Sequence, residues 1–354
     1  MTRPGGVEAG YWHLADDGRV ACDLCPRHCH LRPGQHGFCF VRQNHDGHMV
    51  LATYGRSTGF ALDPIEKKPL YHVLPGSTVL SFGTAGCNLA CKFCQNWSTS
   101  TARDVAALSS SATPGQIATM ARQAGAAGVA YTYNDPIIFA EYAIDTAQAC
   151  RQRGLVNVAV TAGYICAEAR ADFFSAMDAV NVDLKSLDAS FYRKVTGGRL
   201  EVVQDTLVYL VRQTDVWVEI TTLLVPGLND SETEVGRLVE WVAGELGPDV
   251  PLHFTAFHPA HRMRDRKRTP TSTLRRARQM ALDAGMNHVY TGNVVDPDGS
   301  TTACSSCGQD LIVRSGFGLL ANRLDPIGRC PACAAATPGL WSVTAQRPAP
   351  ISPD

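Results

Sequence analysis

The chain has 354 residues, 45% of them hydrophobic, with a formal net charge of −1 and a sequence pI of about 6.8. This length accommodates a barrel-sized domain with smaller modules beside it. The near-neutral charge excludes binding of nucleic acid through a strong overall basic field. No apolar run reaches transmembrane length and no apolar signal region follows Met1, so we expect a cytoplasmic protein without a membrane partner.

Residues 1–75 are expected to form a metal-binding segment. Its four closely spaced cysteines are Cys22, Cys25, Cys29 and Cys39. Thirteen cysteines in a chain of this size indicate metal binding in a reducing compartment rather than disulfides. Four thiolates bind zinc or an iron–sulfur cluster, and we favour zinc. Nearby histidines could replace one ligand: His28, His30 and His36.

Residues 76–293 alternate between strand-like and helix-like segments. The expected strands are 79–83, 128–133, 156–161, 179–185, 216–224, 252–257 and 288–290. The expected helices are 114–126, 136–151, 167–177, 201–213, 231–245 and 271–284. This alternation predicts right-handed βαβ units and a parallel sheet. Periodicity alone does not distinguish a partial barrel from an open doubly wound sheet.

Three cysteines follow the first of these strands on one short loop, spaced Cys87-x3-Cys91-x2-Cys94. Three thiolates can each hold one iron of a [4Fe–4S] cluster, which leaves the fourth iron open to an external ligand. An open iron indicates chemistry rather than plain electron transfer. The alternative is a zinc knuckle or a chance grouping, but zinc sites favour CxxC pairs and four closed ligands.

Active sites of parallel α/β barrels gather at the carboxyl ends of the strands. The residues at those ends that we single out are Asn134, Asp135, Thr161, Gly163, Asp183, Lys185 and His258. Asp183 and Lys185 are two apart on a strand and therefore point to the same side, where the alternative is an ion pair at the rim. Asp135 before Pro136 also fits a helix N-cap, and His258 also fits a solvated loop.

Residues 294–341 contain a second four-cysteine set with two CxxC pairs: Cys304, Cys307, Cys330 and Cys333. This spacing predicts a structural zinc ribbon, with rubredoxin-like iron as the alternative. The intervening loop is not basic, so nucleic acid is not indicated. Residues 342–354 are proline-rich and are expected to form a disordered tail.

The three-cysteine loop resembles the signature of the radical S-adenosylmethionine superfamily. From about residue 11 to 341, further segments resemble the AmmeMemoRadiSam-system radical proteins, relatives of pyruvate formate-lyase activating enzyme. These segments are Cys22–Cys39, Tyr54–Arg56, Asp63–His72, Cys94–Trp97, Tyr131–Pro136, Phe257–Pro259, Tyr290–Val294 and the final ribbon. Asp135 stands where that family usually has Glu.

The resemblance implies an α/β fold, a partial (βα)6 TIM-like barrel between an N-terminal cysteine-rich segment and a C-terminal zinc ribbon. It implies a [4Fe–4S] cluster on Cys87, Cys91 and Cys94, with S-adenosylmethionine on the open iron. Reductive cleavage would release a 5′-deoxyadenosyl radical that abstracts hydrogen from an unidentified substrate. A reductant such as flavodoxin or ferredoxin and AmmeMemo-type partner proteins are also implied.

Residue roles follow from the same resemblance. Asp183 and Lys185 would be catalytic, with Asp183 also near the cofactor. The other cofactor-binding residues would be Phe93, Asn134, Asp135, Thr161, Gly163 and His258. Two rival functions remain: an activating enzyme that makes a glycyl radical on a partner protein, and a non-catalytic metal-binding scaffold.

Overall fold

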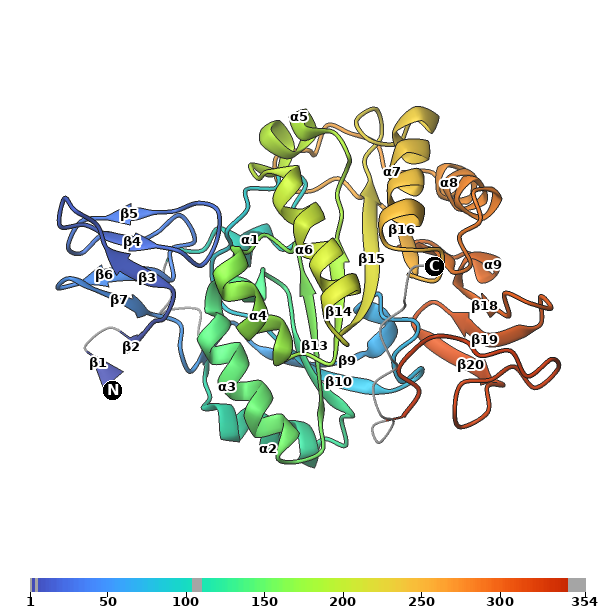
Figure 1. The fold of residues 1–354 in the computed structure, drawn as a ribbon, viewed down its shortest axis with the longest axis horizontal. Coiled ribbons are helices and arrows are strands. Elements are labelled where there is room, and N and C mark those ends of the chain that lie inside the picture. The colour runs from blue at the N-terminus through green and yellow to red at the C-terminus, as the bar shows by residue number, and fades with distance from the viewer. Residues whose placement is uncertain (1, 4–5, 104–109, 343–354) are drawn as a thin grey trace.

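The computed structural model describes residues 2–3, 6–103 and 110–342, and its centre is a parallel sheet (Figure 1). Within those residues the largest sheet has eight strands in the order β17-β16-β15-β14-β13-β12-β10-β9. The strands are β9 (Phe60–Pro64), β10 (Thr78–Phe82), β12 (Gly128–Tyr131), β13 (Val156–Thr161), β14 (Ala179–Asp183), β15 (Trp217–Leu224), β16 (Leu252–Ala256) and β17 (Val289–Gly292). Neighbours pair in parallel from β10 onward, and β9 pairs antiparallel with β10 at one edge.

Helices between consecutive parallel strands cover the outer face of this sheet (Figure 1). They are α2 (Pro114–Gln123), α3 (Ala140–Arg151), α4 (Ala167–Ser175), α6 (Leu200–Gln213), α7 (Glu232–Glu245) and α8 (Thr271–Asp283). Each lies within a few residues of its expected range. The prediction of an α/β fold with a partial, barrel-like parallel sheet is confirmed.

Local chemistry explains where these helices begin. Thr113 caps α2 in a reciprocal box with Gln116, and Ser231 caps α7. The helix expected from residue 136 begins instead as a 3₁₀ turn, η2 (Pro136–Phe139), whose N-cap is Asp135. Two short elements after β14 were not predicted from the sequence. They are the helix α5 (Ala189–Phe191) and the π-helical turn that follows it, η3 (Tyr192–Thr196).

An N-terminal module, residues 6–57, packs on one side of the barrel (Figure 1). Its antiparallel strands are β2 (Gly6–Glu8), β3 (Trp12–Leu14), β4 (Val20–Cys22), β5 (His30–Leu31), β6 (Arg42–His45), β7 (His48–Leu51) and β8 (Arg56–Ser57). Strand β1 (Thr2–Arg3) pairs with β2, and β11 (Ser110–Ser111) pairs with β8. Side chains join the module to the barrel helices: Arg42 forms an ion pair with Glu141 of α3 at 3.0 Å, and Tyr11 donates to Asp172 of α4 at 3.0 Å.

A C-terminal module, residues 297–341, lies at the other side (Figure 1). It contains α9 (Pro297–Ser300), β18 (Thr302–Ala303), β19 (Asp310–Ser315) and β20 (Gly318–Asn322). Apart from residue 342, the expected disordered tail lies outside the described residues. The central sheet also takes β9 from within the first 75 residues, and our domain boundaries stay predictions.

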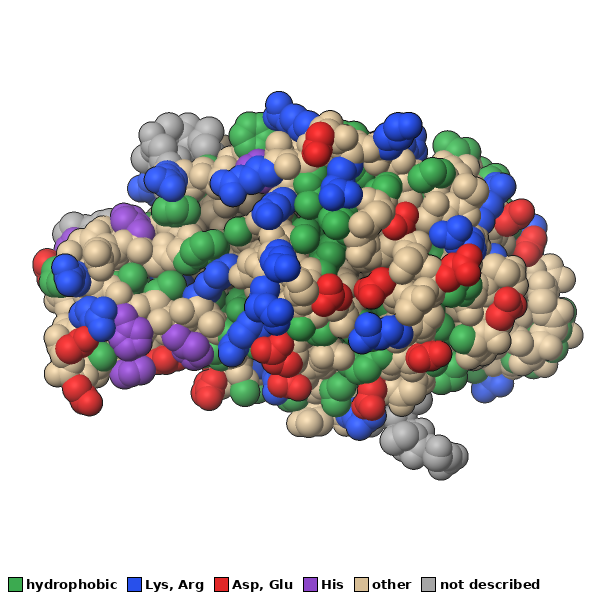
Figure 2. All heavy atoms as spheres, turned by 90° about the horizontal axis from the view of Figure 1, so that it is seen from above, with side chains coloured by type: hydrophobic (Ala, Val, Ile, Leu, Met, Phe, Trp, Pro, Cys, Tyr) green, Lys and Arg blue, Asp and Glu red, His purple; other side chains and the backbone are tan. Residues whose placement is uncertain are grey.

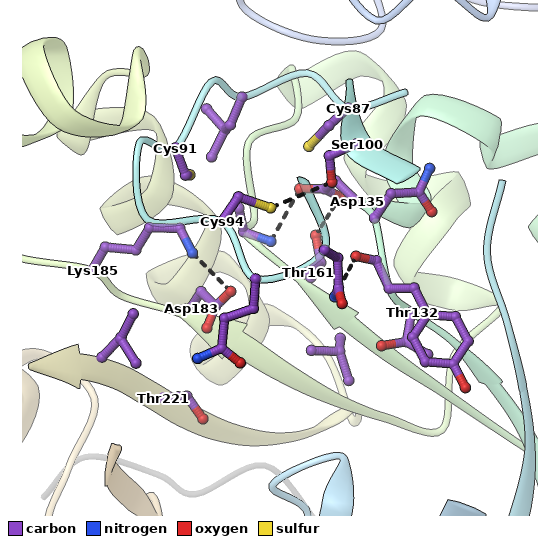
Figure 3. A pocket seen from close by; sticks show the side chains of 18 of the residues that line it. Cys87, Cys91, Cys94, Ser100, Thr132, Asp135, Thr161, Asp183, Lys185 and Thr221 are labelled. Atoms are coloured by element: carbon purple, nitrogen blue, oxygen red, sulfur yellow. Dashed lines mark hydrogen bonds and ion pairs between the residues drawn. The ribbon is translucent and has the colours of Figure 1, made fainter. Parts of the chain in front are cut away.

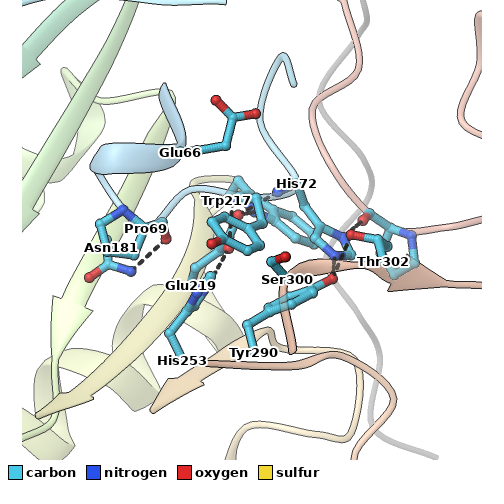
Figure 4. Close-up of polar contacts among 12 residues, drawn as sticks. Glu66, Pro69, His72, Asn181, Trp217, Glu219, His253, Tyr290, Ser300 and Thr302 are labelled. Atoms are coloured by element: carbon cyan, nitrogen blue, oxygen red, sulfur yellow. Dashed lines mark hydrogen bonds and ion pairs between the residues drawn. The ribbon is translucent and has the colours of Figure 1, made fainter. Parts of the chain in front are cut away.

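The lower end of the barrel, at the amino ends of the strands, is closed by residues 65–76, which include the 3₁₀ turn η1 (Ile65–Lys67). The buried carboxylate of Glu219 on β15 accepts from the backbone N–H groups of Tyr71 (2.9 Å) and His72 (2.8 Å). It also accepts from the indole of Trp217 (3.1 Å) and from His253 on β16 (2.6 Å). Figure 4 shows His72, Trp217 and His253 gathered around Glu219.

The C-terminal module completes this lower end. His72 contacts the carbonyl oxygen of Pro338 through Nδ1 (2.7 Å) and the hydroxyl of Tyr290 through Nε2 (2.6 Å) (Figure 4). A carbonyl only accepts, so Nδ1 carries the proton and Nε2 accepts from Tyr290. The buried Arg314 donates to the carbonyl oxygen of Tyr71 at 2.5 Å. We call the side chains of Glu66, His72, Glu219, His253, Tyr290 and Arg314 the lower network.

Candidate active site

The three-cysteine loop, residues 83–96, leaves the end of β10 and leads into α1 (Trp97–Ser100). Two glycines allow its path. A Cβ at Gly83 would lie 2.3 Å from the carbonyl oxygen of Thr132, and one at Gly86, where φ is +86°, would lie 2.0 Å from that of Cys39. The close approach and the left-handed backbone both require glycine here. The loop is therefore wedged between the barrel and the N-terminal module.

The thiols of this loop border a cavity of about 230 Å³ at the carboxyl ends of the strands (Figure 3). Successive strands contribute polar side chains from their carboxyl-terminal halves or just beyond their ends: Thr132, Thr161, Asp183, Thr221, Thr255 and Asn293. Apolar side chains complete the wall: Leu89, Phe93, Val160, Ala162 and Leu223. The cavity thus combines three thiols, a set of strand-end polar groups and an apolar lining.

Asn134 lines this cavity and holds the three-cysteine loop in place. Its side-chain oxygen accepts from the N–H of Thr84 at 3.1 Å, and its amide nitrogen donates to the carbonyl oxygen of Gly86 at 2.9 Å. The residue before it, Tyr133, has φ of +71° and accepts a 2.8 Å hydrogen bond from Asn96 at its carbonyl oxygen. The segment after β12 therefore forms hydrogen bonds with both ends of the three-cysteine loop.

Asp135 is buried and also lines the cavity. Its carboxylate accepts from the hydroxyl of Thr161 (2.8 Å) and from the N–H groups of Ala162 (3.1 Å) and Ile137 (3.2 Å). Burial raises the pKa of this carboxyl group, and these donors oppose the shift. The helix-cap role that we kept as an alternative is present, and the same side chain ties the end of β12 to the end of β13.

Asp183 and Lys185 form an ion pair of 2.8 Å inside the cavity (Figure 3). Burial alone would lower the pKa of Lys185, but Asp183 and the neighbouring Cys91 raise it above its usual value. The ammonium lies 5.7 Å from the ring centre of Phe93, which is buried in the wall. Lys185 is thus a fixed positive charge beside the three thiols.

Two of the residues that the sequence singled out do not line the cavity. Gly163, where φ is +64°, lies behind it, and a Cβ there would contact Val182 at 3.2 Å. His258 follows β16 and is half-buried outside the cavity wall. Conversely, Thr132, Thr255 and Asn293 line the cavity without having been singled out. Their position near the strand ends was the available signal for a cavity residue. A threonine at such a position can equally pack in the core, and the sequence does not distinguish the two cases.

The thiols fit an iron–sulfur cluster. Burial raises the pKa of Cys87, and it raises that of Cys91 to about 12 although Lys185 opposes the shift. Buried thiols of this kind ionise when they bind a cation, and metal ligation requires the thiolate. Figure 3 shows Cys87, Cys91 and Cys94 around one end of the cavity. Soft thiolate donors on one loop suit iron–sulfur chemistry.

The C-terminal four-cysteine set has a tighter geometry. Its sulfur atoms all lie within 4.8 Å of one another, with Cys304 3.6 Å from Cys333 and Cys307 3.7 Å from Cys330. A tetrahedral zinc with Zn–S bonds of about 2.3 Å places sulfurs about 3.8 Å apart. Although burial opposes it, backbone N–H groups of Cys307 and Ser306 lower the pKa of Cys304 to about 7. This set could therefore hold one zinc or iron ion.

The face above the cavity is basic. Seen from above, Lys and Arg side chains form a band across the middle of the molecule (Figure 2). Exposed basic residues lie on the loop itself and on the segments that hydrogen bond to it. They are Lys92, Arg193, Lys194, Arg262 and Arg264. An anionic group near the cavity entrance is attracted by this face although the whole chain has a net charge of −1.

Comparisons with known proteins identify the family of this chain. The model of the Radical SAM superfamily matches residues 82–239, which include the three-cysteine loop and the first strands of the barrel. The uncharacterized protein MJ0808 of Methanocaldococcus jannaschii is 38% identical over 327 residues, which cover 92% of this chain and 97% of that protein. The chain belongs to the radical SAM superfamily. Radical SAM proteins are enzymes that use a [4Fe–4S] cluster, S-adenosylmethionine and a reductant.

Two further proteins match parts of the chain. A choline trimethylamine-lyase activating enzyme of Oleidesulfovibrio alaskensis is 29% identical over 115 residues, 32% of this chain and 37% of that enzyme. A crystallised domain of pyruvate-formate lyase-activating enzyme from Bacteroides vulgatus has a TM-score of 0.42 and 18% identity, and covers 47% of this chain and 99% of that domain. Across the described residues, none of the helices has the length and apolar character needed to cross a membrane.

Proposed function

We propose that this chain reductively cleaves S-adenosylmethionine, and that the resulting 5′-deoxyadenosyl radical abstracts hydrogen from a substrate bound above the barrel. Cys87, Cys91 and Cys94 would hold the [4Fe–4S] cluster, which supplies the electron when bound. One observation carries the proposal: these thiols open on the cavity that also receives Asp183 and Lys185. We place this chemistry in a reducing cytoplasm.

The chain's own residues would bind and orient the cofactor. The buried ammonium of Lys185 suits a carboxylate, and Asp183, about one third of whose side chain is exposed, suits an amino or hydroxyl group. Phe93 offers an apolar face for the adenine, and the same wall limits water around the reacting groups. Asn134 and Asp135 would act at the amino group or by holding the loop, and Thr161 through Asp135. The roles proposed for Gly163, through the backbone, and for His258, at the ribose, rest on the resemblance alone, because neither residue lines the cavity.

Partners are part of the proposal. The basic face suits an acidic one-electron donor such as a flavodoxin or ferredoxin. The resemblance over about residues 11–341 to AmmeMemoRadiSam-system proteins supports an AmmeMemo-type partner. The C-terminal cysteine set would hold a structural zinc.

The test is anaerobic reconstitution with iron and sulfide, reduction with dithionite and assay for 5′-deoxyadenosine. We expect product from the wild type and none above background from the Cys87→Ala/Cys91→Ala/Cys94→Ala variant. The matched control is Cys150→Ala, a buried thiol on α3 away from the cavity, which should keep the activity. Product from the triple variant, or none from a fully reconstituted wild type, would contradict the proposal.

A second candidate is activation of a partner enzyme by formation of a glycyl radical. The similarity to the choline trimethylamine-lyase activating enzyme favours it, because that relative matches 115 residues of this chain. An anaerobic mixture with the substrate protein would then develop the EPR doublet of a glycyl radical. A non-catalytic metal scaffold would instead bind metal and yield no 5′-deoxyadenosine.

A further inference from the structure

The four N-terminal cysteines converge within the N-terminal module. The N–H of Cys22, at the end of β4, donates to the carbonyl oxygen of Cys29 at 3.0 Å. The sulfur of Cys29 accepts from the N–H of Phe38 at 3.4 Å, beside Cys39. Cys25 lies within electrostatic range of the other three thiols. Three separate turns of the chain thus bring four thiols together.

A buried arginine adjoins this group. Arg42 is 1% exposed, donates to both carboxylate oxygens of Glu141 at 3.0 Å and lies within electrostatic range of Cys22 and Cys39. Its Nε has no hydrogen-bond partner among the described residues. An unpaired buried N–H is costly, and a thiolate sulfur is an acceptor that would satisfy it. Four thiolates around a metal centre carry net negative charge, which the guanidinium, itself paired with Glu141, offsets in part.

The spacing of the thiols separates this group from the zinc-like set. Across the described residues, the C-terminal cysteines alone bring three or more candidate ligand atoms within 4.8 Å of one another. Neither the N-terminal group nor the three-cysteine loop brings three of its sulfurs this close together. One zinc ion draws its four sulfurs close, whereas each cysteine of a [4Fe–4S] cluster binds a different iron and the sulfurs stand farther apart.

The N-terminal group also touches the three-cysteine loop directly. The carbonyl oxygen of Cys39 packs against Gly86, the residue before Cys87. Arg27, between Cys25 and Cys29, donates to the carbonyl oxygen of Asn88 at 2.9 Å, and its Nη2 donates to that of Gly197 at 2.6 Å. The two cysteine groups are therefore neighbours in space although they are far apart in the sequence.

We propose that Cys22, Cys25, Cys29 and Cys39 bind a second [4Fe–4S] cluster, which passes single electrons to the cluster on Cys87, Cys91 and Cys94. Four cysteine ligands leave no open iron, so this centre transfers electrons and does no chemistry on substrate. A low-potential flavin or iron–sulfur protein reduces it by one electron, and it is reoxidised as the neighbouring cluster is reduced. The transfer step rests on the proposed function, whereas the presence of the second cluster does not. The sequence spacing had favoured zinc.

The experiment is metal analysis of the anaerobically reconstituted full chain. We expect about eight iron and one zinc in the wild type, because each [4Fe–4S] cluster holds four iron atoms and the C-terminal set holds one zinc. The Cys87→Ala/Cys91→Ala/Cys94→Ala variant should keep about four iron, with a reduced EPR signal that S-adenosylmethionine does not alter. The Cys25→Ala/Cys29→Ala variant should also keep about four iron, with a signal that S-adenosylmethionine does alter.

The wild type decides the result even if a variant fails to fold. About four iron and two zinc in the wild type would overturn the second cluster, and so would a triple variant with two zinc and no iron. Failure of the proposed function gives a different outcome: full iron in the triple variant, or no 5′-deoxyadenosine from a wild type that contains eight iron atoms, about four per cluster. Cys150→Ala should match the wild type in both metals.

Discussion

At the lower end of the barrel, Glu219 accepts hydrogen bonds from Tyr71, His72, Trp217 and His253 and has no exposure. At the upper end, two residues farther along the same strand, Thr221 lines the cavity and its buried hydroxyl has no partner among the described residues. Both ends bury polar side chains. At the lower end the chain itself satisfies both carboxylate oxygens of Glu219, whereas at the upper end the hydroxyl of Thr221 faces a space for a ligand.

The difference teaches which buried polar groups indicate function. A carboxylate with every oxygen paired to the chain, as in Glu219, supports the fold. An ion pair that borders a cavity, as in Asp183 and Lys185, is available to a ligand. Residue type does not distinguish a buried polar group that supports the fold from one that is available to a ligand. Position along the strand does distinguish them, because the carboxyl ends of parallel strands form the functional edge.

The largest expected effect comes from the C-terminal module. Cys304→Ser should release about one zinc per chain and unfold this module, since structural zinc binding contributes about 10 kcal/mol of folding free energy in small zinc modules. Arg314 and the Pro338 carbonyl belong to this module and contact residues 71 and 72, so the lower end should loosen. Zinc analysis would measure the release of the ion, and hydrogen exchange would measure the loosening of the lower end. The optical spectrum of the loop cluster should stay unchanged, and its loss would break the separation of the two ends.

Glu219→Gln should lower the free energy of unfolding by about 3–5 kcal/mol, because an amide group would face donors that now bind a carboxylate. Thr221→Val is the matched change at the upper end of the same strand. It should change stability by less than about 1 kcal/mol, since its hydroxyl has no partner to lose. Chemical unfolding measures both. Equal losses in the two variants would remove the contrast between the ends.

Acidification should weaken the lower end. The ring of the buried His288 lies 4.5 Å from that of His72 at this end. Burial lowers the pKa of His72 to about 3 and that of His288 to about 4, whereas an unfolded histidine has a pKa of about 6.5. The unfolded chain therefore takes up protons first as the pH falls below 6.5, and stability decreases down to pH 4 and 3. Each histidine contributes a slope of about 1.4 kcal/mol per pH unit.

Unfolding free energies between pH 6.5 and 5.5 would measure this slope, a range that precedes protonation of most carboxylates. His288→Phe should remove about half of the histidine contribution, because His72 still titrates. His45→Gln on the half-exposed surface is the control and should leave the slope as in the wild type. An unchanged slope in His288→Phe would show that these buried histidines do not set the acid sensitivity.

The smallest expected effect is that of Asn134→Ala at the upper end. The variant loses hydrogen bonds to Thr84 and Gly86, each worth about 1 kcal/mol. We expect S-adenosylmethionine to bind roughly five- to tenfold more weakly and the cluster to bleach faster in air. Titration followed by EPR measures the affinity. Gln148→Ala, an exposed change on α3, is the control.

Much of the fold could be predicted from the sequence because its signals are local. Alternating apolar strands and capped helices fixed the order of the barrel, and cysteine spacing located the three-cysteine loop. Both roles of Asp135 were also predicted, the helix cap from its place before Pro136 and the cavity role from its place at a strand end. These features depend on neighbours a few residues away.

The missed features depend on contacts between distant parts of the chain. Nothing near residues 65–76 shows that this segment crosses the barrel, because its partners Glu219 and Arg314 lie far along the sequence. Similarly, Thr255 and Asn293 become cavity residues through the curvature of the sheet, which no local pattern encodes. Alternation of hydrophobic residues reports which side of a strand is buried, and does not report what faces it.

The segment of residues 65–76 also determines which contacts form late in folding. Its hydrogen-bond partners lie 147 residues downstream at Glu219, 243 at Arg314 and 266 at Pro338. At a synthesis rate of 5–20 residues per second, the segment leaves the ribosome roughly 10–50 s before its last partner. Contacts of such sequence separation carry a high loop-closure entropy and form late. The lower end is therefore sealed only after Pro338 has emerged, and until then the apolar side chains of Leu70 and Tyr71 lack the cover that they have in the folded protein.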